Sequence, residues 1–162
     1  MKIRLQSGKP TTEEYLMTGI SSSWKDYQVS YHLNNNFQMC FIKQPDIPFY
    51  NRKGEIGKFS FFHFFDEDLR MDYYLFANKN EQTYALPTYR HFEFFILFKL
   101  SSYSIPIQNI LKELRQIQGI SAALQIPLQT IKNLPEILED IELHLLQVSN
   151  KSPKKEASNW MW

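Results

Sequence analysis

The sequence alternates between two sets of side chains most clearly from His91 to Leu100. In an extended backbone, one face of this segment is entirely apolar and holds Phe92, Phe94, Ile96, Phe98 and Leu100. The opposite face is mixed and holds His91, Glu93, Phe95, Leu97 and Lys99. A period of two that is rich in aromatic and branched residues predicts a β-strand. We expect the apolar face in the core and the mixed face to be partly covered or at a sheet edge.

Other segments have the same strand-like character, and they cover residues 2–6, 37–43, 58–65, 70–77 and 120–125. The acidic turn Asp66-Glu67-Asp68 joins two of them into the clearest predicted hairpin. Residues 44–57 contain Pro45, Pro48 and two glycines and are expected to form a loop. Because the connections between consecutive strands are short, an antiparallel arrangement is predicted.

Two helices are predicted from apolar positions that recur every three or four residues. The first is expected over residues 24–33, begins at a capping box of Ser23 and Asp26, and ends at Asn34-Asn35-Asn36. Its expected apolar stripe is Trp24, Tyr27 and Tyr31. The second opens at Ser104 and Pro106 and stops at Gly119. Its apolar stripe consists of Ile107, Ile110, Leu111, Leu114 and Ile117.

A third amphipathic helix is predicted over residues 133–148. Its apolar face is broad and includes Leu134, Ile137, Leu138, Ile141, Leu145 and Leu146. This face is expected either to cover the second face of the sheet or to pair with another chain. Residues 149–162 carry a net charge of +2 and are expected to form a disordered tail that ends in Trp160-Met161-Trp162.

Together these elements predict an α+β fold with a mostly antiparallel sheet of five or six strands. Two helices are expected on one face, with an additional C-terminal helix. The expected organisation is an α+β domain over residues 1–126, an appended helix over 127–148 and the tail over 149–162.

Composition narrows the functional classes. Of the 162 residues, 15% are aromatic, and the net charge of +1 provides no overall attraction to nucleic acid or to acidic lipid. Cys40 is the only cysteine, so an intramolecular disulfide is excluded and a cytoplasmic setting is expected. No secretory signal and no membrane span is recognised, and no membrane association is expected.

Candidate catalytic chemistry is sparse. His63, His91 and Glu93 lie on strands expected to adjoin, where they could form an acid–base or metal cluster if the registers align. Cys40 lies between bulky apolar residues and is interpreted as a buried structural thiol. The turn Asp66-Glu67-Asp68 lacks the glycine and the ligand spacing of a calcium loop. We therefore expect no cofactor and no metal.

The aromatic residues suggest a second interpretation. An antiparallel sheet with an open aromatic face can stack unpaired bases. The residues expected to take part in such binding, or in the cluster above, are His63, Tyr74, Phe76, Arg90, His91, Glu93, Phe95 and Lys99. The alternative is that helices or a partner subunit cover these aromatic residues.

One short pattern has the spacing of a known motif. Leu86-Pro87-Thr88 is followed, after three residues, by Phe92-Glu93-Phe94. This pattern resembles the motif of the IPExxxVDY family of Bacteroidota, with Thr88 in place of the glutamate. Residues 16–34 and 110–120 are similar to the family's N-terminal helix with its approach and to its second helix. The resemblance covers most of residues 1–126 and implies no established activity.

The sequence thus favours a non-enzymatic interaction or regulatory module that binds a protein partner or forms a homodimer. An RNA-binding accessory protein is the first alternative. An enzyme that uses His63, His91 and Glu93 is the second.

Overall fold

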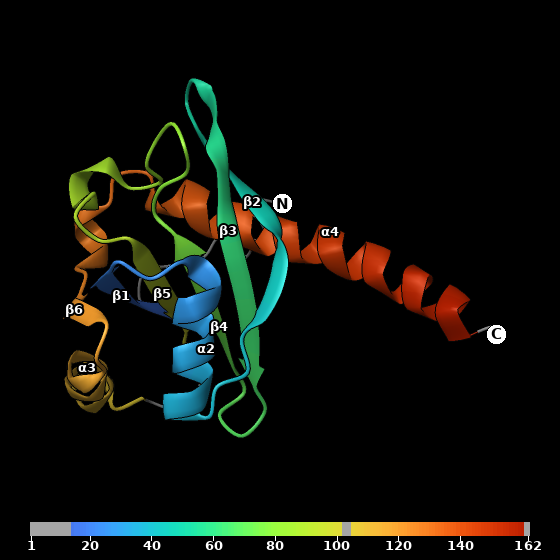
Figure 1. Cartoon of the computed structure of the whole chain (residues 1–162). Coiled ribbons are helices and arrows are strands. Elements are labelled where there is room, and N and C mark those ends of the chain that lie inside the picture. Colours follow the sequence, from blue (N-terminus) through green and yellow to red (C-terminus); the bar gives the residue numbers. More distant parts are fainter. Residues whose placement is uncertain (1–13, 102–104, 161–162) are drawn as a thin grey trace.

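The computed structural model describes residues 14–101 and 105–160, which form one six-stranded antiparallel sheet with helices on both faces (Figure 1). The strands are β1 (Tyr15–Ser22), β2 (Ile42–Asn51), β3 (Gly54–Asp66), β4 (Met71–Ala77), β5 (Phe94–Lys99) and β6 (Ile120–Gln125). The helices are α2 (Asp26–Phe37), α3 (Ile107–Gln116) and α4 (Leu134–Trp160), with short 3₁₀ helices η2 (Pro87–Tyr89) and η3 (Leu128–Thr130). The predicted α+β class and antiparallel sheet are confirmed.

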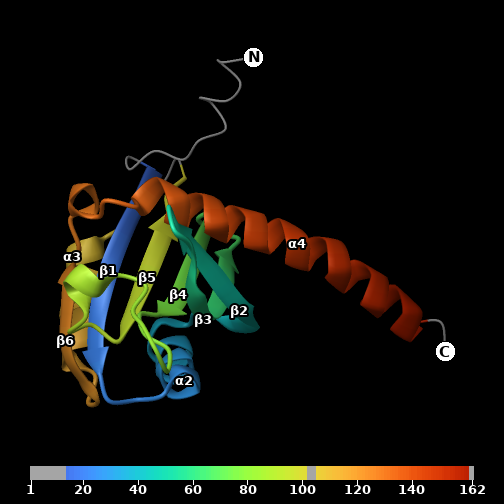
Figure 2. The ribbon, with the colours of Figure 1, turned by 90° about the horizontal axis from the view of Figure 1, so that it is seen from above.

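The strand order is β2-β3-β4-β5-β1-β6, and the sheet separates two apolar clusters. The first cluster, under α2 and α3, contains Val29 and Leu33 of α2 and Leu111 and Leu114 of α3. The second, under α4, contains Ile137, Leu138 and Ile141 of that helix. Figure 2 shows α4 crossing the opposite face of the sheet from α2. The expected pair of helices on one face is therefore present, and the additional C-terminal helix packs on the other face.

β5 lies between β4 and β1, and both of its faces are buried. The mixed face is thus more fully covered than the alternation predicts, since Phe95 and Leu97 are completely buried under α4. The regular alternation also begins later than expected, at Phe94. Phe92 lies in the α4-side cluster instead, where its ring covers Gly19 so closely that a Cβ there would be 2.8 Å from it.

Two strands differ from the sequence prediction. β1 occupies Tyr15–Ser22, a segment that the resemblance assigns to the approach to a helix. Its central residues are buried on both faces, so no alternation marks it. β2 runs through most of the predicted loop 44–57 and starts at Ile42, not at residue 37. The predicted strand over residues 2–6 lies outside the described residues.

The prolines of β2 explain why it was predicted as a loop. β2 is an edge strand, where a missing N–H donor costs no hydrogen bond within the sheet. Pro45 lies at an irregularity where the β2–β3 register shifts between Gln44 and Ile47. At the other edge, Arg115 of α3 donates from Nε to the Ala123 carbonyl of β6 at 2.8 Å. Proline and bulges at one edge disfavour pairing with a further strand.

α2 is longer than predicted, and the residues that it turns towards the core differ from the predicted stripe. It continues through the asparagines to Phe37 and ends at Gln38, which has a φ of 55°. Tyr27 and Tyr31 are about 60% exposed (61% and 60%), whereas Val29 and Leu33 point into the core. The start also differs, because the Lys25 N–H donates to Gln28 Oε1 at 2.8 Å in place of the expected Ser23–Asp26 box.

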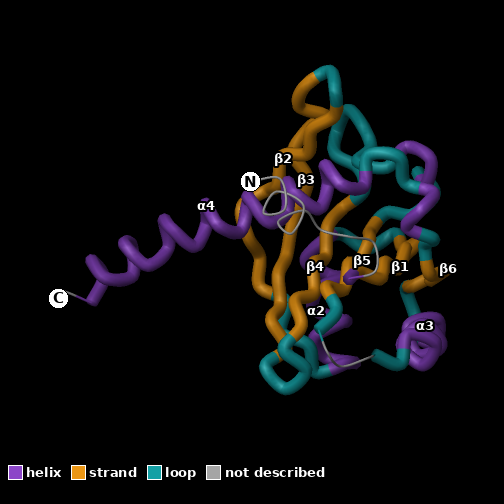
Figure 3. The backbone as a smooth tube through the Cα atoms, turned by 180° about the vertical axis from the view of Figure 1, so that it is seen from behind, coloured by secondary structure: helices purple, strands orange, loops and turns teal. Residues whose placement is uncertain are grey.

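α3 follows its predicted stripe, and α4 does so except at Leu146, which is 61% exposed. Leu111 and Leu114 of α3 are buried as expected. α4 covers the second face of the sheet with Leu134 and Ile141 among its buried residues, and it continues past the predicted end at Val148 to Trp160. The segment predicted as a tail is therefore helical from residue 149 to Trp160, and Met161 and Trp162 lie outside the described residues. Figure 3 shows, from behind, how α4 projects beyond β2.

Among the described helices, none has the length and hydropathy that a bilayer span requires.

Candidate functional site

The aromatic residues proposed for base stacking are part of the core. Tyr74 is 2% exposed, and Phe76 and Phe95 are fully buried beneath α4. The Phe76 and Phe95 rings pack on each other with centroids 5.6 Å apart. A base could reach these rings only if the segments that cover this face of the sheet, α4 among them, moved away. The alternative of a covered aromatic face therefore describes this structure.

The structure does not bring His63, His91 and Glu93 together. His63 Nε2 lies 2.7 Å from Asp72 Oδ1, at the α4 side of the β3–β4 pair. His91 is exposed in the segment before β5, with its ring 4.3 Å from that of Phe92. Glu93 Oε1 accepts a hydrogen bond from the Ser22 N–H at 2.8 Å. The described residues also contain no group of three His, Cys, Asp or Glu side chains arranged to hold a metal ion.

The other predicted residues are also separated. Arg90 is exposed, whereas Lys99 Nζ forms an ion pair with Glu142 Oε2 at 3.1 Å. Cys40 is exposed in the loop before β2, so the prediction of a buried thiol is wrong. The reason is that Met39 and Phe41, its neighbours, turn inward while Cys40 turns outward.

A row of polar side chains lies instead between α4 and the sheet. Glu142 of α4 accepts a hydrogen bond from the Tyr15 hydroxyl at 2.7 Å and pairs with Lys99 at 3.1 Å. Asp72, which pairs with His63, stands directly opposite Lys99 in the β4–β5 register. Burial, with the Glu142 carboxylate beside it, raises the pKa of Tyr15 well above its usual value. Tyr15 therefore stays protonated and donates to Glu142.

Two further polar contacts join α4 to the edge strand β2. Asp140 Oδ2 accepts from the Tyr50 N–H at 3.0 Å, and His144 Nε2 lies 2.8 Å from the Pro45 carbonyl oxygen. Burial raises the pKa of Asp140 to about 6, the nearby Glu139 and Glu136 carboxylates add to the rise, and the Tyr50 hydrogen bond opposes it. These contacts fix the direction in which α4 crosses β2.

The face of α4 that points away from the sheet is apolar where the helix leaves the body. Leu143 is 56% exposed and Leu146 is 61% exposed. The two residues are three apart, so they lie on one side of the helix. Ile42, at the start of β2, is also 59% exposed. We call Leu143 and Leu146 the outer face of α4.

A buried asparagine organises the segment between β4 and β5. Asn78 is fully buried, and its Nδ2 donates to the carbonyls of Leu86, Tyr89 and Phe92 at 3.4, 2.9 and 3.0 Å. Its Oδ1 accepts from the Leu86 N–H at 2.7 Å. One side chain thereby holds the Leu86-Pro87-Thr88 segment against the α4-side core.

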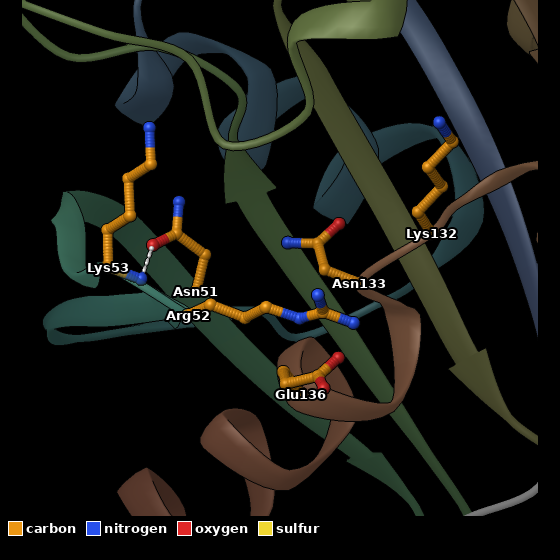
Figure 4. Close-up of a pocket in the computed structure, with 6 residues that line it drawn as sticks. All are labelled: Asn51, Arg52, Lys53, Lys132, Asn133 and Glu136. Carbon is orange, nitrogen blue, oxygen red and sulfur yellow. Dashed lines mark hydrogen bonds between the residues drawn. The ribbon is translucent and has the colours of Figure 1, made fainter.

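A cleft of about 450 Å³ opens beside this segment, between the β2–β3 turn and the start of α4. Its lining residues are Asn51, Arg52, Lys53, Lys132, Asn133 and Glu136. Figure 4 shows Arg52 extending towards Asn133 and Glu136, with Lys53 and Lys132 on opposite sides. Sequence reasoning missed this site, because Arg52 and Lys53 lie in a stretch predicted as a loop. The only signal was two adjacent cations at a turn.

Comparisons with protein-family models, with curated proteins and with solved structures gave no significant match.

Proposed function

We propose that the protein is a non-enzymatic interaction module that self-associates through the outer face of α4. The observation that carries this proposal is that α4 extends past the sheet while Leu143 and Leu146 remain exposed. Apolar side chains on a projecting helix gain stability when another helix covers them.

The distribution of charge along α4 favours a second copy of the chain as the partner of its outer face. Residues 134–148 contain four acidic residues and no lysine or arginine, whereas residues 149–160 have a net charge of +2 in the sequence. Two antiparallel copies of α4 therefore place the acidic half of each helix beside the basic half of the other. Complementary charge of this kind favours the antiparallel over the parallel pair.

The sheet edges offer a weaker route to self-association. β2 carries Pro45 and Pro48, and Arg115 already bonds to the β6 backbone. Both features hinder the addition of a strand from a second chain. Pairing through α4 leaves the sheet and both cores unchanged.

Two further statements belong to this proposal. A cytoplasmic location is supported by the single, exposed Cys40, which has no intramolecular disulfide partner in the sequence. Membership of the IPExxxVDY family is supported by the Leu86-Pro87-Thr88 and Phe92-Glu93-Phe94 pattern.

The test is the mass of the full chain by light scattering over a range of concentrations. The wild-type chain is expected at twice the 19.4 kDa of one chain, and Leu143→Lys with Leu146→Lys is expected at 19.4 kDa. Leu124→Lys on β6 is the matched control, because Leu124 is an exposed leucine (49%) away from α4, and it is expected to stay dimeric. A wild-type mass of one chain at every concentration would refute the proposal.

A further inference from the structure

The cleft between the β2–β3 turn and α4 concentrates positive charge. It is lined by Arg52, Lys53 and Lys132 against one carboxylate, Glu136, so its net charge is +2. The complete chain of 162 residues has a net charge of only +1. The excess of cations is therefore a local feature of this cleft and does not reflect the overall composition.

These cations are available to a ligand. Within residues 14–101 and 105–149, no ion pair and no side-chain hydrogen bond engages Arg52, Lys53 or Lys132. The ion pairs that do occur there involve Lys43, His63 and Lys99. Asn51 and Asn133 add side-chain amides to the lining, and the start of α4 adds the positive end of its helix dipole.

A smaller cavity of about 210 Å³ adjoins the cleft and shares Lys132 and Asn133 with it as lining residues. Its other walls include Leu86, Pro87 and Ile131, with the Tyr89 hydroxyl 2.5 Å from Thr130 Oγ1. The combined site thus has a cationic end and a mainly apolar end.

We propose that this cleft binds a small organic phosphate, with the phosphate at the Arg52 guanidinium between the flanking Lys53 and Lys132 (Figure 4) and an apolar or aromatic body in the smaller cavity. A phosphate monoester carries a charge of about −1.5 to −2 at neutral pH, which matches the local +2. A carboxylate would neutralise only half of this charge. Arg52 supplies the planar, bidentate donor group that suits phosphate oxygens.

The site is independent of the outer face of α4. The proposal predicts an unusual effect for Glu136, the only acidic residue of the lining. Removing its charge strengthens binding of a dianion, whereas removing Arg52 or Lys132 weakens it. If these exposed residues had only a structural role, their substitutions would not change the binding of a dianion in opposite directions.

The experiment is calorimetric titration of the full chain with phenyl phosphate, inorganic phosphate and benzoate at low ionic strength. Phenyl phosphate is expected to bind most tightly of the three. Arg52→Ala and Lys132→Ala are each expected to weaken its binding about two- to fivefold, and Glu136→Gln to tighten it by a similar factor. Lys112→Ala, an exposed lysine of α3, is the matched control and is expected to change nothing.

Three results would overturn the proposal. The first is the absence of saturable binding of phenyl phosphate. The second is binding that Arg52→Ala and Lys132→Ala leave unchanged. The third is a single-stranded RNA oligonucleotide that binds more tightly than phenyl phosphate through the same cations, which would assign the cleft to nucleic acid.

Discussion

The two faces of the sheet are covered in different ways. On the α2–α3 face, short helices place Val29, Leu33, Leu111 and Leu114 on an apolar sheet surface. On the α4 face, a helix of 27 residues crosses the sheet and continues beyond it. Polar side chains enter the contact between helix and sheet on both faces, since Ser60 of β3 donates to Asp26 of α2 on the first and Glu142 of α4 accepts from Tyr15 of β1 on the second.

The two faces differ mainly in the length of the covering helix, because large exposed side chains occur on both, with Tyr27 and Tyr31 on α2 and Leu143 and Leu146 on α4. A helix that served only as a cover would end where the sheet ends. α4 instead continues past that point and exposes Leu143 and Leu146 on its side away from the sheet, and its first turn borders the cationic cleft. The α4 face therefore combines packing, directional polar contacts and both proposed binding surfaces.

The largest expected effect comes from truncating one core residue on each face. Leu114→Ala and Ile137→Ala are each expected to lower the free energy of unfolding by about 2–5 kcal/mol, because both side chains are completely buried. Only Ile137→Ala is expected to reduce dimer formation as well, since it loosens α4. Urea unfolding and light scattering measure the two effects. A loss below about 1 kcal/mol for Ile137→Ala would show that α4 is not part of the core.

The next effect concerns the segment that forms the apolar end of the cleft. Asn78→Ala is expected to lower the free energy of unfolding by about 2–3 kcal/mol, because it leaves buried carbonyls and the Leu86 N–H without partners. The control is Asn36→Ala, since Asn36 is exposed and its side-chain amide donates to the His32 carbonyl one turn earlier in α2. A change in Asn78→Ala no larger than in this control would contradict the organising role of Asn78.

A smaller effect is expected from the polar row under α4. Tyr15→Phe removes the hydroxyl that donates to Glu142 and is expected to lower the free energy of unfolding by about 1 kcal/mol. Tyr27→Phe removes a hydroxyl from a side chain that is 61% exposed and is expected to have no measurable effect. Thermal unfolding of both variants compares them directly. Equal midpoints would argue that this row contributes nothing to holding α4.

The last expected effect is a change of stability with pH that Asp140 of the α4 face contributes. The pKa of Asp140 is about 6 in the folded chain and near 3.8 in the unfolded chain, so the folded state binds more protons between these values. This residue therefore makes stability fall as pH rises from about 4 to 6. Asp140→Asn keeps an acceptor for the Tyr50 N–H and is expected to remove this contribution. Urea titrations across that pH range should show a flatter curve for the variant; an unchanged slope would contradict the assignment.

The sequence was a good guide where one face of an element is apolar and the other is polar. The α3 stripe is the clearest case, since Leu111 and Leu114 are buried as predicted. It was a poor guide for β1, because Met17 and Thr18 are both completely buried and no alternation appears. It also failed for β2, where an edge position tolerates Pro45 and Pro48.

The candidate sites were harder to predict, for a related reason. Arg52 and Lys132 line one cleft but are far apart in the sequence, and only the crossing of α4 brings them together. Glu142, Lys99 and Tyr15 meet for the same reason. His63 and His91, by contrast, were expected on adjoining strands but have different partners. In each case the packing of elements that are far apart in the sequence determined which residues meet.

Disulfide cross-linking between copies tests the central claim, pairing through the outer face of α4, most directly. In a Cys40→Ser background, Leu146→Cys is expected to form covalent dimers on mild oxidation, because antiparallel outer faces place residue 146 near its counterpart. Glu139→Cys is expected to remain uncross-linked, since antiparallel pairing separates the two copies of this position by about 16 Å along the helix axis. Efficient cross-linking at 139 would indicate a parallel pair. Cross-linking at 146 no greater than for Leu124→Cys on β6 would contradict self-association through α4.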